Sequence, residues 1–128
     1  MALECLRILV VDDCVDSTEV LALLIAGRGH EVRVAHNVDE ALRVAADFKP
    51  EVALLDIMIR CESGFFLARE IRALPELGQC RLVAMTGFAR EQHRQTSEAA
   101  GFHEHLNKPI DVGQLFEAIE APRSRLAR

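Results

Sequence analysis

The sequence lacks the excess of basic residues that nucleic-acid-binding proteins usually carry. It has 20 acidic and 15 basic residues among 128, and its formal net charge is −5. It has no apolar run near the roughly 20 residues that a helix needs to cross a bilayer, and its N-terminus has no signal-peptide pattern. We therefore expect a soluble, cytoplasmic protein that binds neither nucleic acid nor membrane.

The sequence also lacks a cysteine pattern typical of a metal or redox site. Its cysteines form no C-x-x-C pair and match no zinc template; they are Cys5, Cys14, Cys61 and Cys80. A redox or thiolate role for Cys14 and Cys61 stays open, because both come shortly after the aspartates discussed below. Free thiols in a reducing compartment are the simpler interpretation.

Internal repeats, linkers and low-complexity segments are absent as well. Half of the residues are hydrophobic, which is enough for one core of two or three layers. We expect a single domain over residues 1–128, with a short basic tail at about 122–128.

Five short segments have the composition of strands and alternate with helical patterns. The strands are expected at residues 5–11, 30–35, 52–56, 81–85 and 102–107, and a helix follows each of them. The first helix is expected to begin with Asp16 as its N-cap and Glu19 three residues on. Its apolar face would consist of Val20, Leu21 and Leu24. Strands alternating with helices imply a parallel sheet covered by helices on both faces.

The pattern within each strand predicts its place in the sheet. Residues 30–35 and 102–107 alternate between apolar and polar, as edge strands do, whereas the other three strands are continuously apolar. This partition fits the order 2-1-3-4-5 of a flavodoxin-like α/β fold, a doubly wound (βα)5 sandwich of three layers. In this fold ligands bind between strands 1 and 3. A loop is expected at residues 57–63, before a helix that opens at Gly64.

Three carboxylates are expected to meet at that binding position. Asp12 and Asp13 follow the first strand, and Asp56 ends the third. Two unit charges about 4 Å apart repel by about 4 kcal/mol at an effective dielectric of about 20. Such a cluster needs to be neutralised by protonation or by a divalent cation. Ligands that are all oxygen suit Mg²⁺, which often shares its coordination with a phosphate.

Two further polar residues end the fourth and fifth strands. These are Thr86 and Lys108. A lysine ammonium and a threonine hydroxyl both donate hydrogen bonds to phosphate oxygens, and Gly87 leaves room beside Thr86. With a metal and a carboxylate nucleophile, they are the parts needed to pass a phosphoryl group to a carboxylate.

With these residues in place, the chain resembles the receiver domains of two-component response regulators, in particular those associated with hybrid sensor histidine kinases. The likeness covers about residues 6–121 and rests on Asp12-Asp13, Asp56, Thr86 and Lys108-Pro109. It implies a phosphoacceptor that takes a phosphoryl group from a sensor histidine kinase or a histidine phosphotransfer protein. It also implies signalling through a conformational switch.

The resemblance implies a role for each of the acidic residues. Asp56 would accept the phosphoryl group, and any enzymatic activity would be confined to self-phosphorylation and self-dephosphorylation there. Asp13 would bind Mg²⁺ directly, and Asp12 would help directly or through water. The backbone carbonyl of Met58 would be a further metal ligand.

The resemblance also implies how the signal leaves the site. Thr86 would bond a phosphoryl oxygen and shift towards it, while Lys108 would pair with the phosphoryl group beside a cis bond to Pro109. The downstream partner would bind the face formed by the fourth helix, the fifth strand and the fifth helix. We expect a monomer or weak dimer, and Met1 and the short ends favour a free protein over a receiver cut from a hybrid kinase.

Three features depart from the family pattern. Arg60 stands where a proline usually follows four residues after the acceptor, and His105 replaces the usual switch aromatic. The segment at residues 90–100 has no large apolar anchor. We expect His105 to swing inward on phosphorylation and, because its unperturbed pKa is about 6.5, to make partner binding depend on pH.

Two other functions fit the sequence less well. An Mg²⁺-dependent small-molecule phosphatase or phosphotransferase of the haloacid dehalogenase type would carry a D-x-D motif, but Cys14 and Val15 follow Asp13. A flavodoxin-like cofactor binder would need a phosphate-binding loop rich in glycine, serine and threonine after the first strand, where this chain has carboxylates.

The remaining histidines and phenylalanines are interpreted as structural. His30, His36, His93 and His103 are expected on the surface or at strand edges, and Phe65, Phe66, Phe102 and Phe116 in the core.

Overall fold

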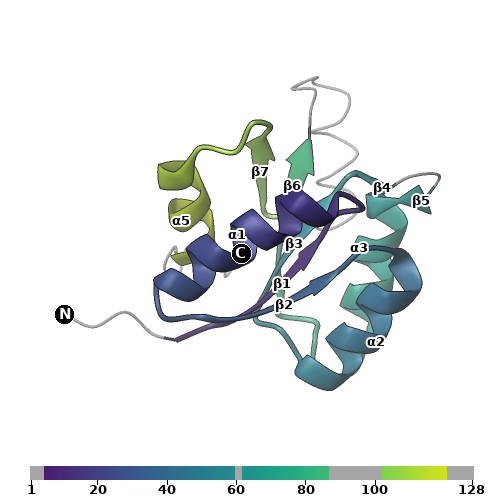
Figure 1. Ribbon diagram of the computed structural model, residues 1–128. Coiled ribbons are helices and arrows are strands. Elements are labelled where there is room, and N and C mark those ends of the chain that lie inside the picture. Colours follow the sequence, from purple (N-terminus) through teal and green to yellow (C-terminus); the bar gives the residue numbers. More distant parts are fainter. Residues whose placement is uncertain (1–4, 60–61, 87–101, 121–128) are drawn as a thin grey trace.

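The computed structural model describes residues 5–59, 62–86 and 102–120 (Figure 1). Five strands form one parallel sheet in the order β2-β1-β3-β6-β7. Their bounds are β1 Arg7–Val11, β2 Glu31–Ala35, β3 Val52–Asp56, β6 Arg81–Thr86 and β7 Glu104–Asn107. The predicted order 2-1-3-4-5 is confirmed, with the two alternating strands at the edges. The helix predicted at residues 90–100 lies outside the described residues.

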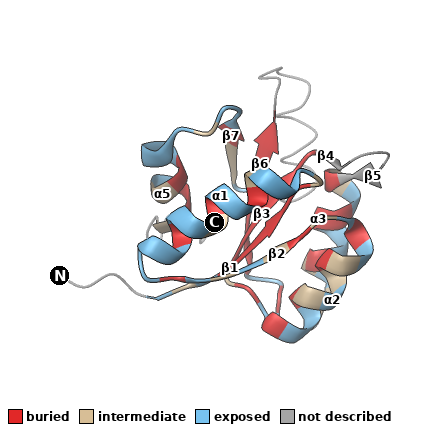
Figure 2. Cartoon of the chain, in the orientation of Figure 1, coloured by how far each residue is buried: buried red, intermediate tan, exposed pale blue. Residues whose placement is uncertain are grey.

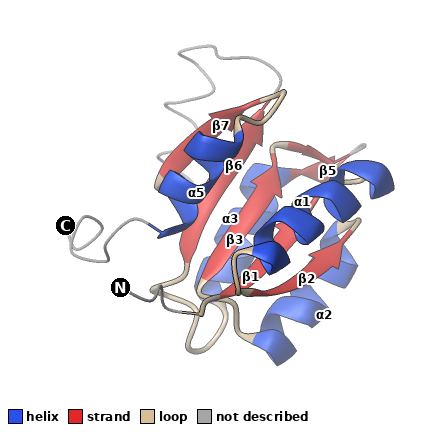
Figure 3. Cartoon of the chain, turned by 60° about the vertical axis from the view of Figure 1, so that its left-hand side comes forward, coloured by secondary structure: helices blue, strands red, loops and turns tan. Residues whose placement is uncertain are grey.

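Four described helices cover the two faces of the sheet, which makes three layers (Figures 1 and 3). They are α1 Val15–Gly27, α2 Val38–Phe48, α3 Gly64–Ala73 and α5 Val112–Glu120. Leu9 and Val11 belong to the core under α2 and α3, whereas Ile8 and Val10 belong to the core under α1 and α5. This alternation follows from the period of two in a strand. Figure 2 shows the central strands β1, β3 and β6 mostly buried and the outer faces of the helices exposed.

No helix among the described residues combines the length and the apolarity that a membrane crossing needs.

The first helix differs from its prediction in start and in face. It begins at Val15, its N-cap is Cys14, and Asp16 lies within the first turn. The cap predicted at Asp16 is therefore wrong, because Asp12 accepts the N–H of Cys14 at 3.0 Å and directs the chain into the helix two residues earlier. The buried positions of α1 are Thr18, Leu21 and Ile25. Val20 is 56% exposed and Leu24 36%, so only Leu21 of the predicted face is buried.

The segment after β3 is not a plain loop. Met58–Ile59 (β4) and Glu62–Ser63 (β5) form a short antiparallel pair. Arg60 lies outside the described residues. The N–H of Gly64 donates to the carbonyl of Ile57 at 2.8 Å, which closes the base of this hairpin and leads the chain into α3.

Two predicted placements of aromatic and histidine side chains are wrong. His30 is buried, because its ring bridges the residue before β1 and the end of α5. Its Nδ1 accepts from the N–H of Leu6 at 3.1 Å, and its Nε2 lies 2.9 Å from Glu120. Phe66 is 53% exposed, since the inward face of α3 is occupied by Leu67 and Ile71.

Candidate functional site

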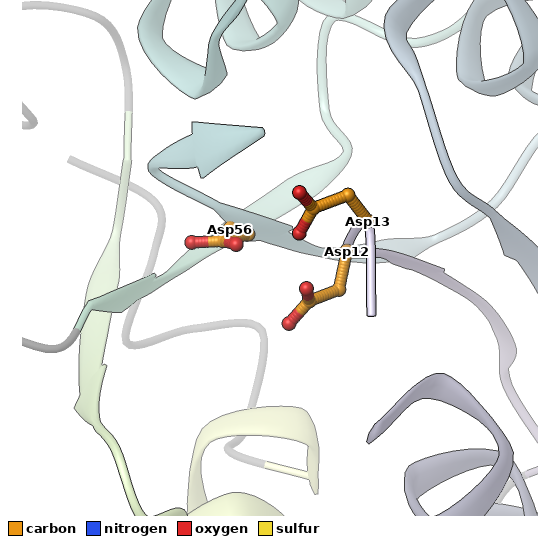
Figure 4. A group of neighbouring side chains, drawn as sticks. All are labelled: Asp12, Asp13 and Asp56. Carbon is orange, nitrogen blue, oxygen red and sulfur yellow. The ribbon is translucent and has the colours of Figure 1, made fainter. Parts of the chain in front are cut away.

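The three predicted carboxylates converge at the carboxyl ends of β1 and β3. These strands are neighbours, with Val11 opposite Leu55, so the residues that follow them share one edge of the sheet. Asp12, Asp13 and Asp56 each offer an oxygen, and these oxygens all lie within 4.8 Å of one another. Figure 4 shows the three carboxyl groups gathered at this edge. Asp12 and Asp56 are buried and Asp13 is half-buried. We refer to these three residues as the acid cluster.

Lys108 reaches the acid cluster from the end of β7. Its Nζ donates to Asp12 Oδ2 at 2.9 Å and lies 3.4 Å from Asp56 Oδ2. The N–H of Lys108 donates to the carbonyl of Thr86 at 2.8 Å, which ties the lysine to the end of β6. One ammonium group thus contacts carboxylates from two different strand ends.

Lys108 and Asp12 each stabilise the charged form of the other. Burial by itself would lower the pKa of Lys108, but the hydrogen bond to Asp12 and the nearby charge of Asp56 raise it above its ordinary value. Burial by itself would raise the pKa of Asp12, but hydrogen bonds from Cys14 N–H and Lys108 hold it below its ordinary value. At neutral pH both groups are therefore ionised.

The donor set of the cluster fits a hard divalent cation. All three side chains offer carboxylate oxygens, and their mutual distances allow one ion to contact more than one of them. Met58, the predicted source of a backbone ligand, lies two residues after Asp56 in β4. A cation at this point would offset the repulsion that one lysine only partly balances.

The sheet also places the remaining predicted residues. Thr86 is buried at the end of β6, opposite Asn107 in the register with β7. The peptide bond between Lys108 and Pro109 is cis, as predicted. His105 is half-buried opposite Ala84, and it lines a hollow against α5 rather than the acid cluster.

Sequence reasoning placed Gly64 at a helix start but missed its contact with the site. A Cβ atom at this position would lie 2.2 Å from the backbone oxygen of Asp56 and 2.8 Å from the Cα of Ile57. The start of α3 therefore packs directly on the backbone that carries Asp56, and only glycine fits this approach. A glycine inside the first turn of a helix was the available signal, because glycine is unfavourable within a helix unless a close contact requires it.

The comparisons with known proteins agree with this geometry. The family model of the response regulator receiver domain matches residues 8–120. An uncharacterised 14.6 kDa protein in the sodA1 3′ region of Leptolyngbya boryana is 34% identical over 113 residues, which cover 88% of this chain and 86% of that protein.

Two solved structures share the fold. A response regulator from Burkholderia pseudomallei, solved with a phosphorylated aspartic acid, a calcium ion and citrate, is 29% identical; the TM-score is 0.83, and the match covers 94% of this chain and 69% of that one. The receiver domain of the sensor histidine kinase PA1611 from Pseudomonas aeruginosa, with magnesium in its active-site cleft, is 23% identical; the TM-score is 0.83, and the match covers 94% and 99%. The chain therefore belongs to the response regulator receiver domain family, the phosphoacceptor domains of two-component signalling.

Proposed function

We propose that Asp56 is the phosphoacceptor of this chain and that Mg²⁺ assists the reaction. The observation that carries the proposal is the position of Asp56: it belongs to the acid cluster and lies 3.4 Å from the ammonium of Lys108. A phosphoryl group on Asp56 would therefore lie between a cation site and a lysine, which is the arrangement that stabilises phosphoryl transfer.

In the proposed step, a carboxylate oxygen of Asp56 attacks the phosphorus of a phosphohistidine on a partner protein. The new phosphorus–oxygen bond forms while the phosphorus–nitrogen bond breaks, and the partner's ring leaves as neutral imidazole if its other nitrogen already carries a proton. Mg²⁺ would supply charge neutralisation and orientation of the phosphoryl oxygens. Lys108 then pairs with the phosphoryl group, and the Thr86 hydroxyl donates to one of its oxygens.

The proposed metal ligands rest on the oxygen donors of the cluster and on the family match. Both oxygens of Asp12 accept hydrogen bonds, from Cys14 N–H and from Lys108, so we assign Asp12 to a metal-bound water. Asp13, Asp56 and the carbonyl of Met58 are the proposed direct ligands. Magnesium in the cleft of the PA1611 receiver and calcium in the Burkholderia regulator support a divalent cation here.

The partners follow from the same chemistry. The phosphoryl donor would be a sensor histidine kinase or a histidine phosphotransfer protein, and a downstream protein would bind the face that includes β7 and α5. The protein would work in the cytoplasm, as a monomer or weak dimer, and would act on no substrate beyond its own aspartate. No observation favours the phosphatase or the flavodoxin-like cofactor binder over the family match.

Phosphorylation is tested by incubating the chain with acetyl phosphate and Mg²⁺ and measuring its intact mass. One phosphate should appear on the wild type and none on Asp56→Asn. Asp47→Asn, which changes an exposed aspartate of α2, should be labelled like the wild type. Phosphate on the Asp56→Asn protein would refute the assignment.

Metal binding is tested separately by thermal unfolding. Millimolar Mg²⁺ should raise the melting temperature of the wild type, because a ligand that binds only the folded state stabilises it. Asp13→Asn should reduce this shift, and Asp47→Asn should keep it. An equal shift in the Asp13→Asn protein would count against the site.

A further inference from the structure

A polar hollow of about 300 Å³ lies between β7 and α5, away from the acid cluster. Its lining includes Glu104, Leu106, Asn107, Gln114, Glu117 and Ala118, and the half-buried ring of His105 forms part of the wall. β7 is an edge strand, and α5 lies beside it (Figures 1 and 3). This volume is at the lower end for ligand pockets, so it suits one long side chain rather than a large ligand.

The hollow carries two carboxylates that form no ion pair with a basic side chain in the described part of the chain. Neither Glu104 nor Glu117 pairs with a basic side chain among the described residues. Glu120, one turn after Glu117, differs because Arg28 and His30 hold it. Lys108 is the one lysine or arginine between residues 104 and 120, and its ammonium pairs with Asp12. The hollow is therefore complementary to a cationic group.

The lining has the chemistry that receives an arginine. Leu106 and Ala118 are buried and contribute little surface to the hollow, so its lining is mainly polar. Carboxylates and side-chain amides around it accept hydrogen bonds, and a guanidinium carries five donors in a planar fork. We propose that this hollow is a docking site for an arginine-bearing segment of a protein partner.

The hollow is joined to the acid cluster through the strand ends. Asn107, which lines the hollow, lies opposite Thr86 in the sheet. Lys108 follows Asn107, donates its N–H to Thr86, and places its ammonium 3.4 Å from Asp56. A shift of these strand ends on phosphorylation therefore moves the rim of the hollow. This coupling, which rests on the proposed function, makes phosphorylation and arginine binding affect each other's equilibrium by the same factor.

The probe is the peptide acetyl-Ala-Ala-Arg-Ala-Ala-amide, titrated into the full chain and followed by amide NMR. The largest shifts should fall at residues 104–107 and 114–118. A matched peptide with citrulline, which keeps the shape of arginine without its charge, should bind more weakly. The double variant Glu104→Gln, Glu117→Gln should lose about threefold to tenfold in affinity, the size expected for two exposed ion pairs. Glu70→Gln on α3, also exposed, should bind like the wild type.

The same titration distinguishes a protein partner from other occupants of the hollow. Equal affinity in the double variant, or shifts spread evenly over α2 and α3, would overturn the proposal. The chain's own arginines could compete instead: if Arg123→Gln, Arg125→Gln and Arg128→Gln together strengthen peptide binding, the hollow serves this chain rather than a partner. Unchanged binding in that triple variant supports the partner.

Intact-mass measurement on the same samples separates this proposal from the proposed function. The Glu104 and Glu117 variant should accept phosphate from acetyl phosphate as the wild type does. If the wild type takes no phosphate but the peptide still binds at the hollow, the phosphoacceptor assignment fails and the docking site stands. If the wild type takes up phosphate and the peptide does not bind, only the proposed docking site is refuted.

Discussion

Lys108 and Asp12 are joined by a hydrogen bond of 2.9 Å, whereas the same ammonium lies 3.4 Å from Asp56. Before phosphorylation, the nearer partner of the lysine is thus the neighbour of the proposed acceptor rather than the acceptor itself. In the proposed reaction, phosphorylation of Asp56 would place a stronger anion within reach of Lys108 and would draw the ammonium away from Asp12. Asp12 would then serve to hold the lysine in position until the phosphoryl group arrives.

Removal of this lysine should destabilise the fold. Lys108→Gln leaves Asp12 and Asp56 without their shared cation, and we expect a loss of about 1–3 kcal/mol in the free energy of unfolding. The pKa of Asp12 is depressed in the folded chain, so its stabilisation is present above its ordinary value of 3.8 and is lost as the pH falls through the folded value. Denaturant unfolding measured from pH 7 down to pH values below 3.8 should show that the free energy of unfolding falls more steeply for the wild type than for Lys108→Gln. Lys49 forms an exposed ion pair with Glu76, so Lys49→Gln should change the free energy of unfolding by less than about 1 kcal/mol.

Gly64 should tolerate no side chain. In Gly64→Ala the new Cβ would overlap the backbone of Asp56, and relieving this clash should cost about 1–3 kcal/mol of stability. It should also displace Asp56 and slow labelling by acetyl phosphate by about tenfold or more, since small misplacements of a reacting group are costly. Gly78→Ala is the matched control, because a Cβ there meets no atom within 4 Å. Normal labelling of Gly64→Ala would show that the packing of α3 does not position the acceptor.

Glu120 should make the fold sensitive to acid at the end opposite the acid cluster. Its hydrogen bond with Arg28 holds the pKa of the Glu120 carboxyl below its ordinary value, and His30 adds to the effect although burial opposes it. A depressed pKa means that the stabilisation is present above the ordinary value of 4.5 and is lost as the pH falls through the folded value. Melting temperatures should therefore show Glu120→Gln less stable than the wild type at pH 7, with the difference shrinking below pH 4.5. A constant difference across this range would contradict the role of the charge, and Glu70→Gln should show no such trend.

His105 should couple phosphorylation to pH. Its ring is half-buried in the wall of the hollow between β7 and α5, where a change in its charge would act on whatever binds there. Binding of the arginine peptide to the phosphorylated protein should vary between roughly pH 6 and 8, and His105→Phe should flatten this variation. NMR titration of the ring with and without beryllofluoride, which mimics the phosphoryl group, provides the direct measurement. Identical curves in the two states would rule out the coupling.

Several misplaced residues show where local pattern was insufficient. The cap predicted at Asp16 failed because the carboxylate of Asp12 binds the N–H of Cys14 and starts α1 two residues earlier. His30 has a polar ring on a predicted edge strand, which favours exposure, yet α5 covers it and Glu120 pairs with it. The contact of His30 with Glu120 joins residues 90 positions apart, and no local periodicity encodes it.

The sequence by itself determined the order of the sheet and the convergence of Asp12, Asp13 and Asp56. Continuous and alternating apolar runs distinguish central from edge strands, and in a parallel sheet the residues that end neighbouring strands must meet at one edge. Only the tertiary structure decided which carboxylates Lys108 contacts, how closely Gly64 approaches Asp56, and which carboxylates line the hollow beside α5. These depend on how helices and strand ends are packed to within about an ångström, and at that scale the side chains of distant segments determine the outcome.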